Sequence, residues 1–142
     1  MIEIETMWLF EAFEDHSGTV HFYLDKQTGE IVRISEMSET QEEQQEIYDR
    51  IESEPDRWVD IEPLPSRDAF GVMEDFVAGL PDGEDKRTLE RALSYKKPFS
   101  NFKQALSDMP DIRKQWFVFH DNHTRETAEA WLKDQGIEAK LK

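Results

Sequence analysis

Two short segments near the N-terminus alternate apolar and polar residues with a period of two, and a turn-like sequence separates them. Val20, Phe22 and Leu24 are the apolar members of the first segment, and Val32 and Ile34 are those of the second. A period of two is typical of strands that bury one face. Because the short sequence DKQTGE joins the two segments, the chain is predicted to form an antiparallel β-hairpin here.

The connecting sequence DKQTGE can be interpreted as a hairpin turn or as a calcium-binding loop. Asp25 can accept hydrogen bonds from amides of its own turn, and Gly29 tolerates the left-handed conformation of a type I turn with a bulge. A helix–loop–helix calcium loop needs its glycine one position later, and it needs a ligand at the ninth position, where Arg33 stands. The sequence therefore predicts a turn that builds the fold.

The remainder of the N-terminal half predicts two helices and one further strand. Thr6 is expected to cap a short helix that ends at the HSG sequence of residues 16–18. Thr40 and Glu43 have the spacing of a capping box, which predicts a helix that runs to about Glu54. A third strand is indicated by the apolar residues that follow, which are Trp58, Val59 and Ile61.

The C-terminal half is predicted to form several helices, which are separated by breaks at Pro81, Asp82 and Gly83 and at Pro110. Ser66 is expected to cap a central helix, Pro98 to take the first position of a later helix, and Gly136 to cap the last helical region. This last region begins after Pro110 and is consistent with one helix or with two. The central helix has the most regular apolar stripe in the chain, formed by Phe70, Met73, Phe76, Val77 and Leu80.

These elements predict an α+β fold, in which a small antiparallel β-hairpin or three-stranded sheet near the N-terminus packs against a mainly helical C-terminal half. A chain of 142 residues has the size of one domain, so we expect a single domain over residues 1–142. The nine phenylalanines and four tryptophans supply the large buried areas that a small core requires.

Charge is distributed unevenly along the chain, which has a formal net charge of −15. Residues 1–71 hold 19 acidic and 5 basic side chains, a balance of −14, whereas residues 72–142 hold 13 and 12, a balance of −1. An acidic surface repels nucleic acid, anionic lipid and other acidic proteins. Partners of the first half are therefore expected to be basic.

Other features of the sequence limit its cellular setting and its chemistry. The chain has no cysteine, which excludes disulfides, thiolate metal sites and cysteine nucleophiles. The N-terminus MIEIETMWLF does not resemble a signal peptide, and no apolar run is long enough to span a bilayer. We therefore expect a soluble cytoplasmic protein that does not bind membranes.

The helix after Thr40 carries the densest group of carboxylates in the chain. Its apolar face is thin, so we expect the helix to lie on the surface, with Glu46 paired to Arg50 four residues later. Catalysis requires a carboxylate in a dry cleft, which a polar helix does not provide. The functional alternative is an electrostatic docking surface formed by Glu42, Glu43, Glu46 and Asp49.

Residues 91–107 contain four bases and no acid, interleaved with three aromatic rings. Such a mixture can bind single-stranded nucleic acid, because the bases contact phosphates and the rings stack on nucleobases. Alternatively, Phe99 and Phe102 belong to a core face and leave ordinary surface charges around them. The candidate nucleic-acid residues are Arg91, Lys96, Lys97 and Lys103.

His120 and His123, which are three positions apart with Asp121 between them, are the pair with the most metal-ligand character. Zinc requires three or four protein ligands, so a third would have to come from elsewhere in the fold. We therefore expect neither a metal nor a cofactor. No P-loop, dinucleotide-binding glycine pattern or G-x-S-x-G sequence occurs, and no catalytic residue is assigned.

Five stretches span most of the chain from Tyr23 onward, and their order and spacing are distinctive: YLDKQTGEIV, MEDFV, PFSNFKQAL, WFVFHD and AEAWLKDQGI. Together they resemble a bacterial family described only as uncharacterised protein family 0158. The resemblance implies a bacterial cytosolic protein with a mixed fold. It implies no established activity and transfers no catalytic residue.

The biochemical function is therefore unknown from the sequence, and three hypotheses are ranked. The first is a small acidic, non-enzymatic interaction or regulatory module of the bacterial cytosol that binds a basic protein or associates with itself. The second is a nucleic-acid-associated protein that uses residues 91–107. The third is a metal-dependent hydrolase centred on His120 and His123.

Overall fold

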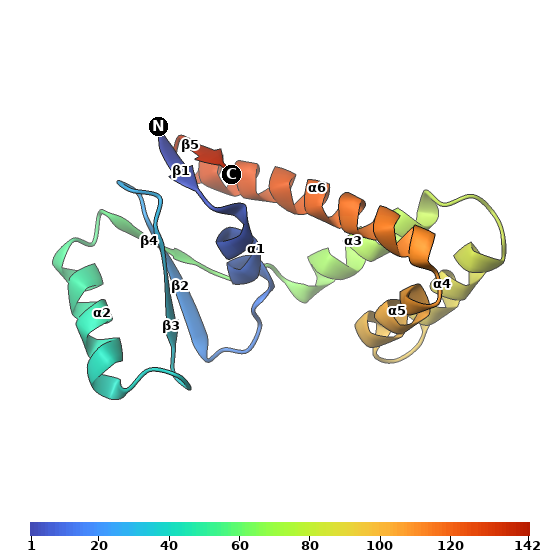
Figure 1. Ribbon diagram of the computed structural model, residues 1–142, viewed down its shortest axis with the longest axis horizontal. Coiled ribbons are helices and arrows are strands. Elements are labelled where there is room, and N and C mark those ends of the chain that lie inside the picture. The colour runs from blue at the N-terminus through green and yellow to red at the C-terminus, as the bar shows by residue number, and fades with distance from the viewer. The chain divides into compact units, whose positions relative to one another are not determined.

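The computed structural model describes all 142 residues, and the chain divides into two units (Figure 1). The N-terminal unit comprises residues 1–64 and 127–142, and the helical unit comprises residues 65–126. The long helix α6 (Pro110–Asp134) contributes residues to both. The single domain expected for residues 1–142 stays a prediction.

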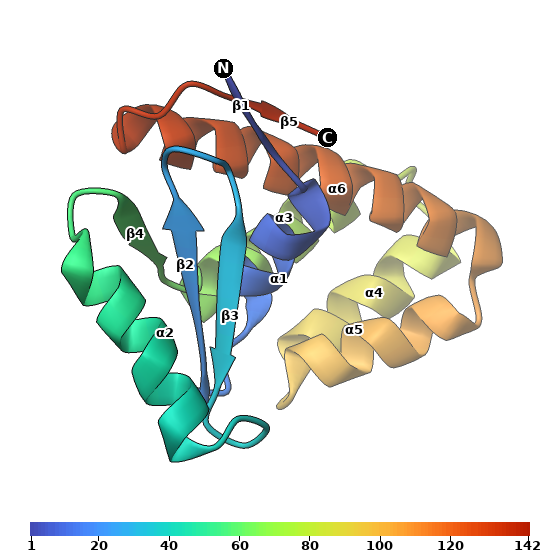
Figure 2. The ribbon, with the colours of Figure 1, turned by 60° about the vertical axis from the view of Figure 1, so that its left-hand side comes forward.

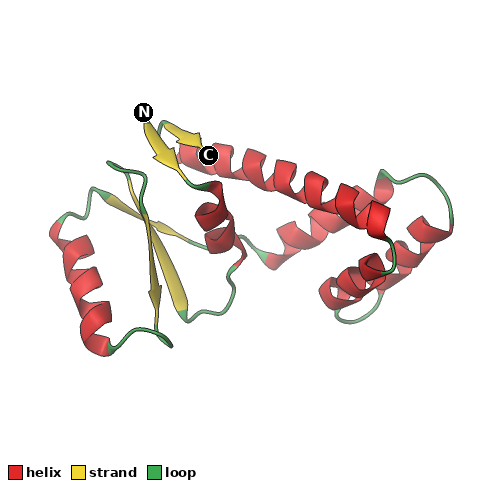
Figure 3. Ribbon diagram, in the orientation of Figure 1, coloured by secondary structure: helices red, strands yellow, loops and turns green.

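The N-terminal unit contains all five strands, whereas the helical unit contains helices only (Figure 3). This distribution confirms the α+β class with a mainly helical C-terminal half. Besides the end of α6, the N-terminal unit is built from β1 (Ile2–Ile4), α1 (Thr6–Glu14), β2 (Val20–Asp25), β3 (Ile31–Ser35), α2 (Gln41–Ser53), β4 (Trp58–Ile61) and β5 (Ala139–Leu141).

The predicted hairpin and third strand are confirmed as one antiparallel sheet with the strand order β3-β2-β4. Helix α2 covers one face of this sheet and α1 covers the other (Figure 2). On the α1 face, the alternate residues of β2 are buried with residues of α1 and of the end of α6, as their period of two predicted. The buried members of this core are Ile4, Leu9, Ala12, Phe13, Phe22, Leu24, Ile61, Ala128 and Leu132.

The opposite face of the sheet carries a smaller apolar layer beneath α2. Strand register places Tyr23 opposite Val32 on one side and opposite Asp60 on the other. The ring of Tyr23 meets the ring of Tyr48 from α2 edge to face, with 6.3 Å between centroids. Ile34 and Trp58 are buried outside both main cores and have the strand parity of this face.

A two-stranded parallel sheet of β1 and β5 joins the two chain termini, and the sequence did not predict β5. Lys142 donates from its amide to the carbonyl of Ile4, and its own carbonyl accepts from the Thr6 amide. The Thr6 hydroxyl also donates to the Lys142 carbonyl, over 2.8 Å. The predicted capping of α1 by Thr6 is therefore wrong: its side chain holds the C-terminus instead.

The helical unit contains α3 (Ser66–Ala78), α4 (Glu84–Ser94), α5 (Pro98–Ser107) and the first part of α6. Its core centres on Trp116, whose ring lies 5.3 Å from that of Phe76 and 5.0 Å from that of Phe102 between centroids. Most of the apolar stripe predicted for α3 is buried here. The buried residues are Val72, Met73, Phe76, Val77, Leu80, Leu89, Phe102, Leu106 and Trp116.

Helix boundaries in the C-terminal half agree with the sequence signals except at one end. Pro98 takes the first turn of α5, and Gly136 has the positive φ (71°) of a C-terminal cap. Residues 110–134 form one helix, which settles the choice left open by the sequence. Capping by Ser66 is wrong, because this residue lies inside α3 and the helix has no side-chain cap. None of the helices is long and apolar enough to cross a membrane.

Candidate functional site

Helix α2 is fixed at its start by the predicted capping box, which is confirmed. The Thr40 hydroxyl accepts from the Glu43 amide over 3.2 Å, and the Glu43 carboxylate accepts from the Thr40 amide over 3.3 Å. This reciprocal pair satisfies backbone donors that a helix start leaves unpaired. No residue of α2 is buried, which confirms that the helix lies on the surface.

The single base of α2 is directed toward the sheet. Arg50 donates to the Glu30 carboxylate over 3.4 Å, and its guanidinium carbon lies 5.1 Å from the ring centroid of Trp58. The predicted pairing of Arg50 with Glu46 is therefore wrong. Because Arg50 is engaged with Glu30 and Trp58, it does not neutralise the carboxylates on the outer side of the helix.

We call the outer carboxylates of α2 the acidic face. All are exposed, and the structure brings them together on one short helix, as the sequence predicted. Asp49 accepts a hydrogen bond from Gln45, and Glu43 belongs to the capping box, but neither contact is with a base. The acidic face consists of Glu42, Glu43, Glu46 and Asp49.

The N-terminal unit as a whole reinforces the charge of the acidic face. It contains 21 acidic and 7 basic side chains, a balance of −14. Beside α2, partial burial raises the pKa of Asp60, and the neighbouring Glu62 raises it further. Burial also raises the pKa values of Tyr23 and Tyr48. The acidic face is thus part of a unit in which negative charge predominates.

The turn that the sequence interpreted as fold-building is confirmed, and Asp25 is its anchor. This carboxylate is fully buried, and Arg57 donates to both of its oxygens, over 2.9 and 2.7 Å. The amides of Gln27 and Thr28 donate to it as well, over 2.9 and 3.4 Å. Hydrogen bonds from Arg57 are the main reason that the pKa of Asp25 falls to about 2. Asp25 ties the hairpin turn to the residue that precedes β4.

Because the pKa of Asp25 is low in the folded state, the free energy of unfolding is expected to decrease at acidic pH. Its ordinary pKa of 3.8 applies to the unfolded chain, so the ionised carboxylate favours the folded state by about 2 kcal/mol at neutral pH. This contribution is complete above the unfolded pKa and disappears as the pH falls through the folded value. In urea denaturation, the stability difference between the wild type and Asp25→Asn should shrink by about 2 kcal/mol between pH 7 and pH 2. A difference that stays constant over this range would contradict the assignment.

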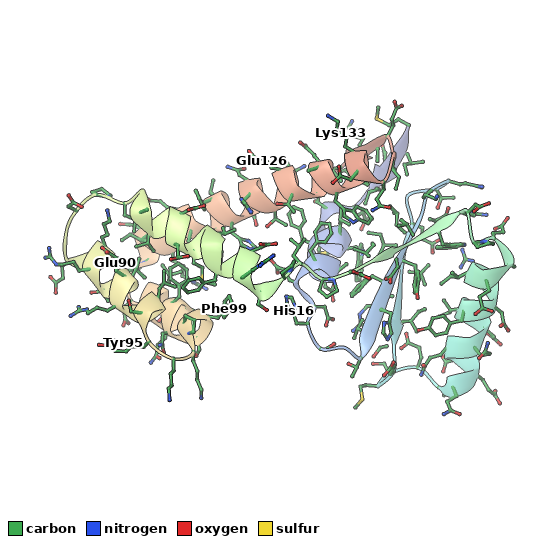
Figure 4. The ribbon with its side chains drawn as sticks, turned by 180° about the vertical axis from the view of Figure 1, so that it is seen from behind. His16, Glu90, Tyr95, Phe99, Glu126 and Lys133 are labelled. Atoms are coloured by element: carbon green, nitrogen blue, oxygen red, sulfur yellow. The ribbon has the colours of Figure 1, made fainter.

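The basic residues of the second hypothesis are exposed and lie in α4, in α5 and in the connection between them. Figure 4 labels Tyr95 at this connection. Of the three interleaved rings, Phe102 is fully buried, and Phe99 is half-buried and meets Phe70 edge to face. Tyr95 is 67% exposed and is the one ring of the three open to a partner. The stacking surface that single-stranded nucleic acid would need is therefore reduced to one residue. The exposed bases are Arg91, Lys96, Lys97 and Lys103.

The histidines of the third hypothesis lie on α6 without the ligands that a metal requires. His120 is half-buried against the ring of Trp116, and its Nδ1 atom lies 3.8 Å from the Asp121 carboxylate. His123 is exposed. No group of three or more histidine, cysteine, aspartate or glutamate side chains in the structure could hold a metal ion. A metal-dependent hydrolase therefore receives no support from the geometry.

Comparisons with known proteins agree on one family. The model of the uncharacterised protein family UPF0158 matches residues 1–142. The UPF0158 protein PA5073 of Pseudomonas aeruginosa is 31% identical over 127 residues, which cover 89% of this chain and 80% of that protein. No solved structure matches. The match over the whole chain shows that this protein belongs to the uncharacterised family UPF0158, as its sequence stretches indicated.

Proposed function

We propose that this protein is a non-enzymatic interaction module of the bacterial cytoplasm whose acidic face docks onto a basic protein surface. The observation that carries the proposal is the position of Arg50, which binds Glu30 and Trp58 and leaves the outer side of α2 without a base. A helix whose outer side carries carboxylates and no base is suited to a partner that supplies the missing cations.

The acidic face is held in place by contacts that fix α2 to the rest of the unit. The capping box fixes the start of the helix, the Tyr23–Tyr48 ring pair fixes its middle, and Arg50 ties it to Glu30. These contacts leave Glu42 and Glu46 without an intramolecular ion pair. Docking thus requires ordering of side chains but no refolding of the helix, which reduces the entropic cost of binding.

The physical effect of the acidic face is expected mainly on the rate of encounter. A unit with a charge balance of −14 attracts basic surfaces over about one Debye length, roughly 10 Å at 0.1 M salt. Catalysis by these carboxylates would require a dry cleft, whereas all four are exposed. The same exposure that disfavours catalysis suits a surface that meets a partner.

Charge reversal tests the proposal. The variant Glu42→Lys, Glu46→Lys, Asp49→Lys leaves the capping box of Thr40 and Glu43 intact and changes three charges at a spacing that keeps them on one side of α2. Tagged protein is used to capture partners from bacterial lysate at low and at high salt. We expect capture of a protein with a basic surface, and we expect the variant to weaken this capture about tenfold or more, since like charges then oppose each other.

A matched control keeps the change in net charge but places it elsewhere in the N-terminal unit. Glu5, Glu129 and Glu138 are exposed and form no ion pair, so the variant with lysine at all three changes the same number of charges. This control should capture the partner almost as well as the wild type. Equal loss in both variants would attribute capture to net charge alone, and full capture by the α2 variant would refute docking through the acidic face.

A further inference from the structure

We infer that the acidic face binds a second copy of this chain through that copy's basic segment, residues 91–107. This inference rests on the proposed function and names its partner. The basic segment contains four bases and no acid, and it lies in a helical unit that has 11 acidic and 10 basic side chains in all. Each copy therefore carries both members of a complementary pair of surfaces.

The bases of the segment are available for binding. All are exposed, and none takes part in an ion pair within the chain. Arg91 makes a hydrogen bond to the Thr88 hydroxyl over 3.3 Å, which leaves its charge uncompensated. The acidic face likewise lacks a base, since Arg50 is engaged elsewhere. Contact between the two surfaces would neutralise charge on both. The bases concerned are Arg91, Lys96, Lys97 and Lys103.

The connection between α4 and α5 holds the centre of the basic segment in a defined conformation. Lys97 has φ 59° and ψ 54° and is the one non-glycine residue of the chain with positive φ. A left-handed residue with a side chain costs about 1–2 kcal/mol, so the surrounding structure must hold it. Asn101 does so, because its side chain donates to the Lys96 carbonyl over 2.9 Å and its amide donates to the Lys97 carbonyl over 3.0 Å.

This conformation presents two adjacent lysines beside an open aromatic ring. Figure 4 shows Tyr95 at the connection between α4 and α5, and 67% of its surface is exposed. Tyrosine is enriched at protein interfaces, because its ring buries apolar area while its hydroxyl hydrogen-bonds. Opposite a helix that exposes glutamates, Lys96 and Lys97 supply the charges and Tyr95 covers the apolar stems of the glutamate side chains.

An acidic protein surface fits the segment better than nucleic acid does. Phe102 is buried and Phe99 lies against Phe70, which removes two of the three rings that could stack on nucleobases. The N-terminal unit of the same chain, with a balance of −14, would repel a phosphate backbone that approached it. The helical unit of another copy, with 11 acidic and 10 basic side chains, is not repelled in this way, and its basic segment is attracted to the acidic face.

In this contact the acidic face of one copy meets the basic segment of another, so the two surfaces differ. Each surface can therefore be altered without changing the other. The acidic-face variant carries lysine at Glu42, Glu46 and Asp49 and retains the natural basic segment. The basic-segment variant carries glutamate at three lysines and retains the natural acidic face. Neither can associate with itself, but a mixture of the two restores a natural contact. The altered residues of the basic segment are Lys96, Lys97 and Lys103.

Sedimentation velocity of the purified full chain is the experiment. At about 20 mM salt we expect concentration-dependent association that weakens about tenfold or more at about 500 mM salt, where screening shortens the range of charge interactions. Each variant alone should stay monomeric, and the equimolar mixture should associate. A control with glutamate at Arg67, Lys114 and Arg125, which are exposed bases of the helical unit outside the segment, should associate like the wild type. Far-ultraviolet circular dichroism verifies that every variant is folded.

Other results would overturn the inference and separate it from the proposed function. A wild type that is monomeric at about 100 µM and low salt, or a mixture that stays monomeric while the wild type associates, would refute contact between copies. If that monomer still captured a basic protein through α2, the docking function would stand without the self-contact. Binding of a single-stranded oligonucleotide that the basic-segment variant loses would assign the segment to nucleic acid and refute the inference.

Discussion

Replacing Asp25 with alanine is expected to lower the free energy of unfolding by about 3–5 kcal/mol, because it removes one partner from a buried ion pair. Arg57 would keep a partly buried guanidinium, with 24% of its side chain exposed, that has lost its two shortest hydrogen bonds. The amides of Gln27 and Thr28 would lose their acceptor as well. Urea denaturation monitored by circular dichroism measures the loss.

Glu54 provides the control for this prediction, since it binds the same guanidinium at the surface. Its carboxylate lies 3.0 Å from Arg57 Nη1, but 52% of its side chain is exposed. A pair in contact with water contributes about 0–1 kcal/mol, so Glu54→Ala should have little effect. Comparable losses for the two variants would show that burial of Asp25 does not determine the strength of this pair.

The parts of the fold that the sequence predicted depend on residues close together in the chain. Alternation over six residues defines β2, and the spacing of Thr40 and Glu43 defines the start of α2. The turn between β2 and β3 follows from Asp25 and Gly29, which act within five residues of each other. Local patterns suffice where the physical cause is itself local.

The parts that the sequence did not predict depend on residues far apart in the chain. Asp25 and Arg57 are 32 positions apart, and the hydroxyl of Thr6 donates to a carbonyl 136 positions later. Strand β5 has three residues and forms through pairing with β1, so its own pattern is too short to identify it. Tertiary contacts also explain why Arg50 does not pair with Glu46, its neighbour on the same helix. Its guanidinium contacts Glu30 and Trp58 instead.

The candidate surfaces were predictable in composition but not in detail. Exposure of the acidic face followed from the thin apolar side of α2, which the sequence shows directly. The pattern of residues 91–107 was consistent with a core face and with a nucleic-acid-binding surface. The structure shows that its aromatic rings differ in burial. Phe102 belongs to the core and Tyr95 to the surface, a distinction that depends on packing against Trp116.

Replacing Gly29 with alanine is expected to destabilise the N-terminal unit by about 2 kcal/mol or more, since it adds a steric clash to a conformational cost. Gly29 has φ +84°, and a Cβ atom built there would overlap the carbonyl oxygen of Glu3 in β1. That neighbour is backbone held by the β1–β5 pairing, so it cannot move aside as a flexible side chain could. The hairpin turn and β1 would have to separate.

Gly18 isolates the conformational part of this cost. It has a similar φ of +76°, yet nothing lies within 4 Å of a Cβ atom built on it. Gly18→Ala should therefore lower the free energy of unfolding only by the conformational cost of a left-handed alanine, about 1 kcal/mol. Urea denaturation of both variants gives the difference, which is the energy of the close approach between turn and β1. Equal losses would mean that β1 yields to the added methyl group and that the turn does not require glycine for space.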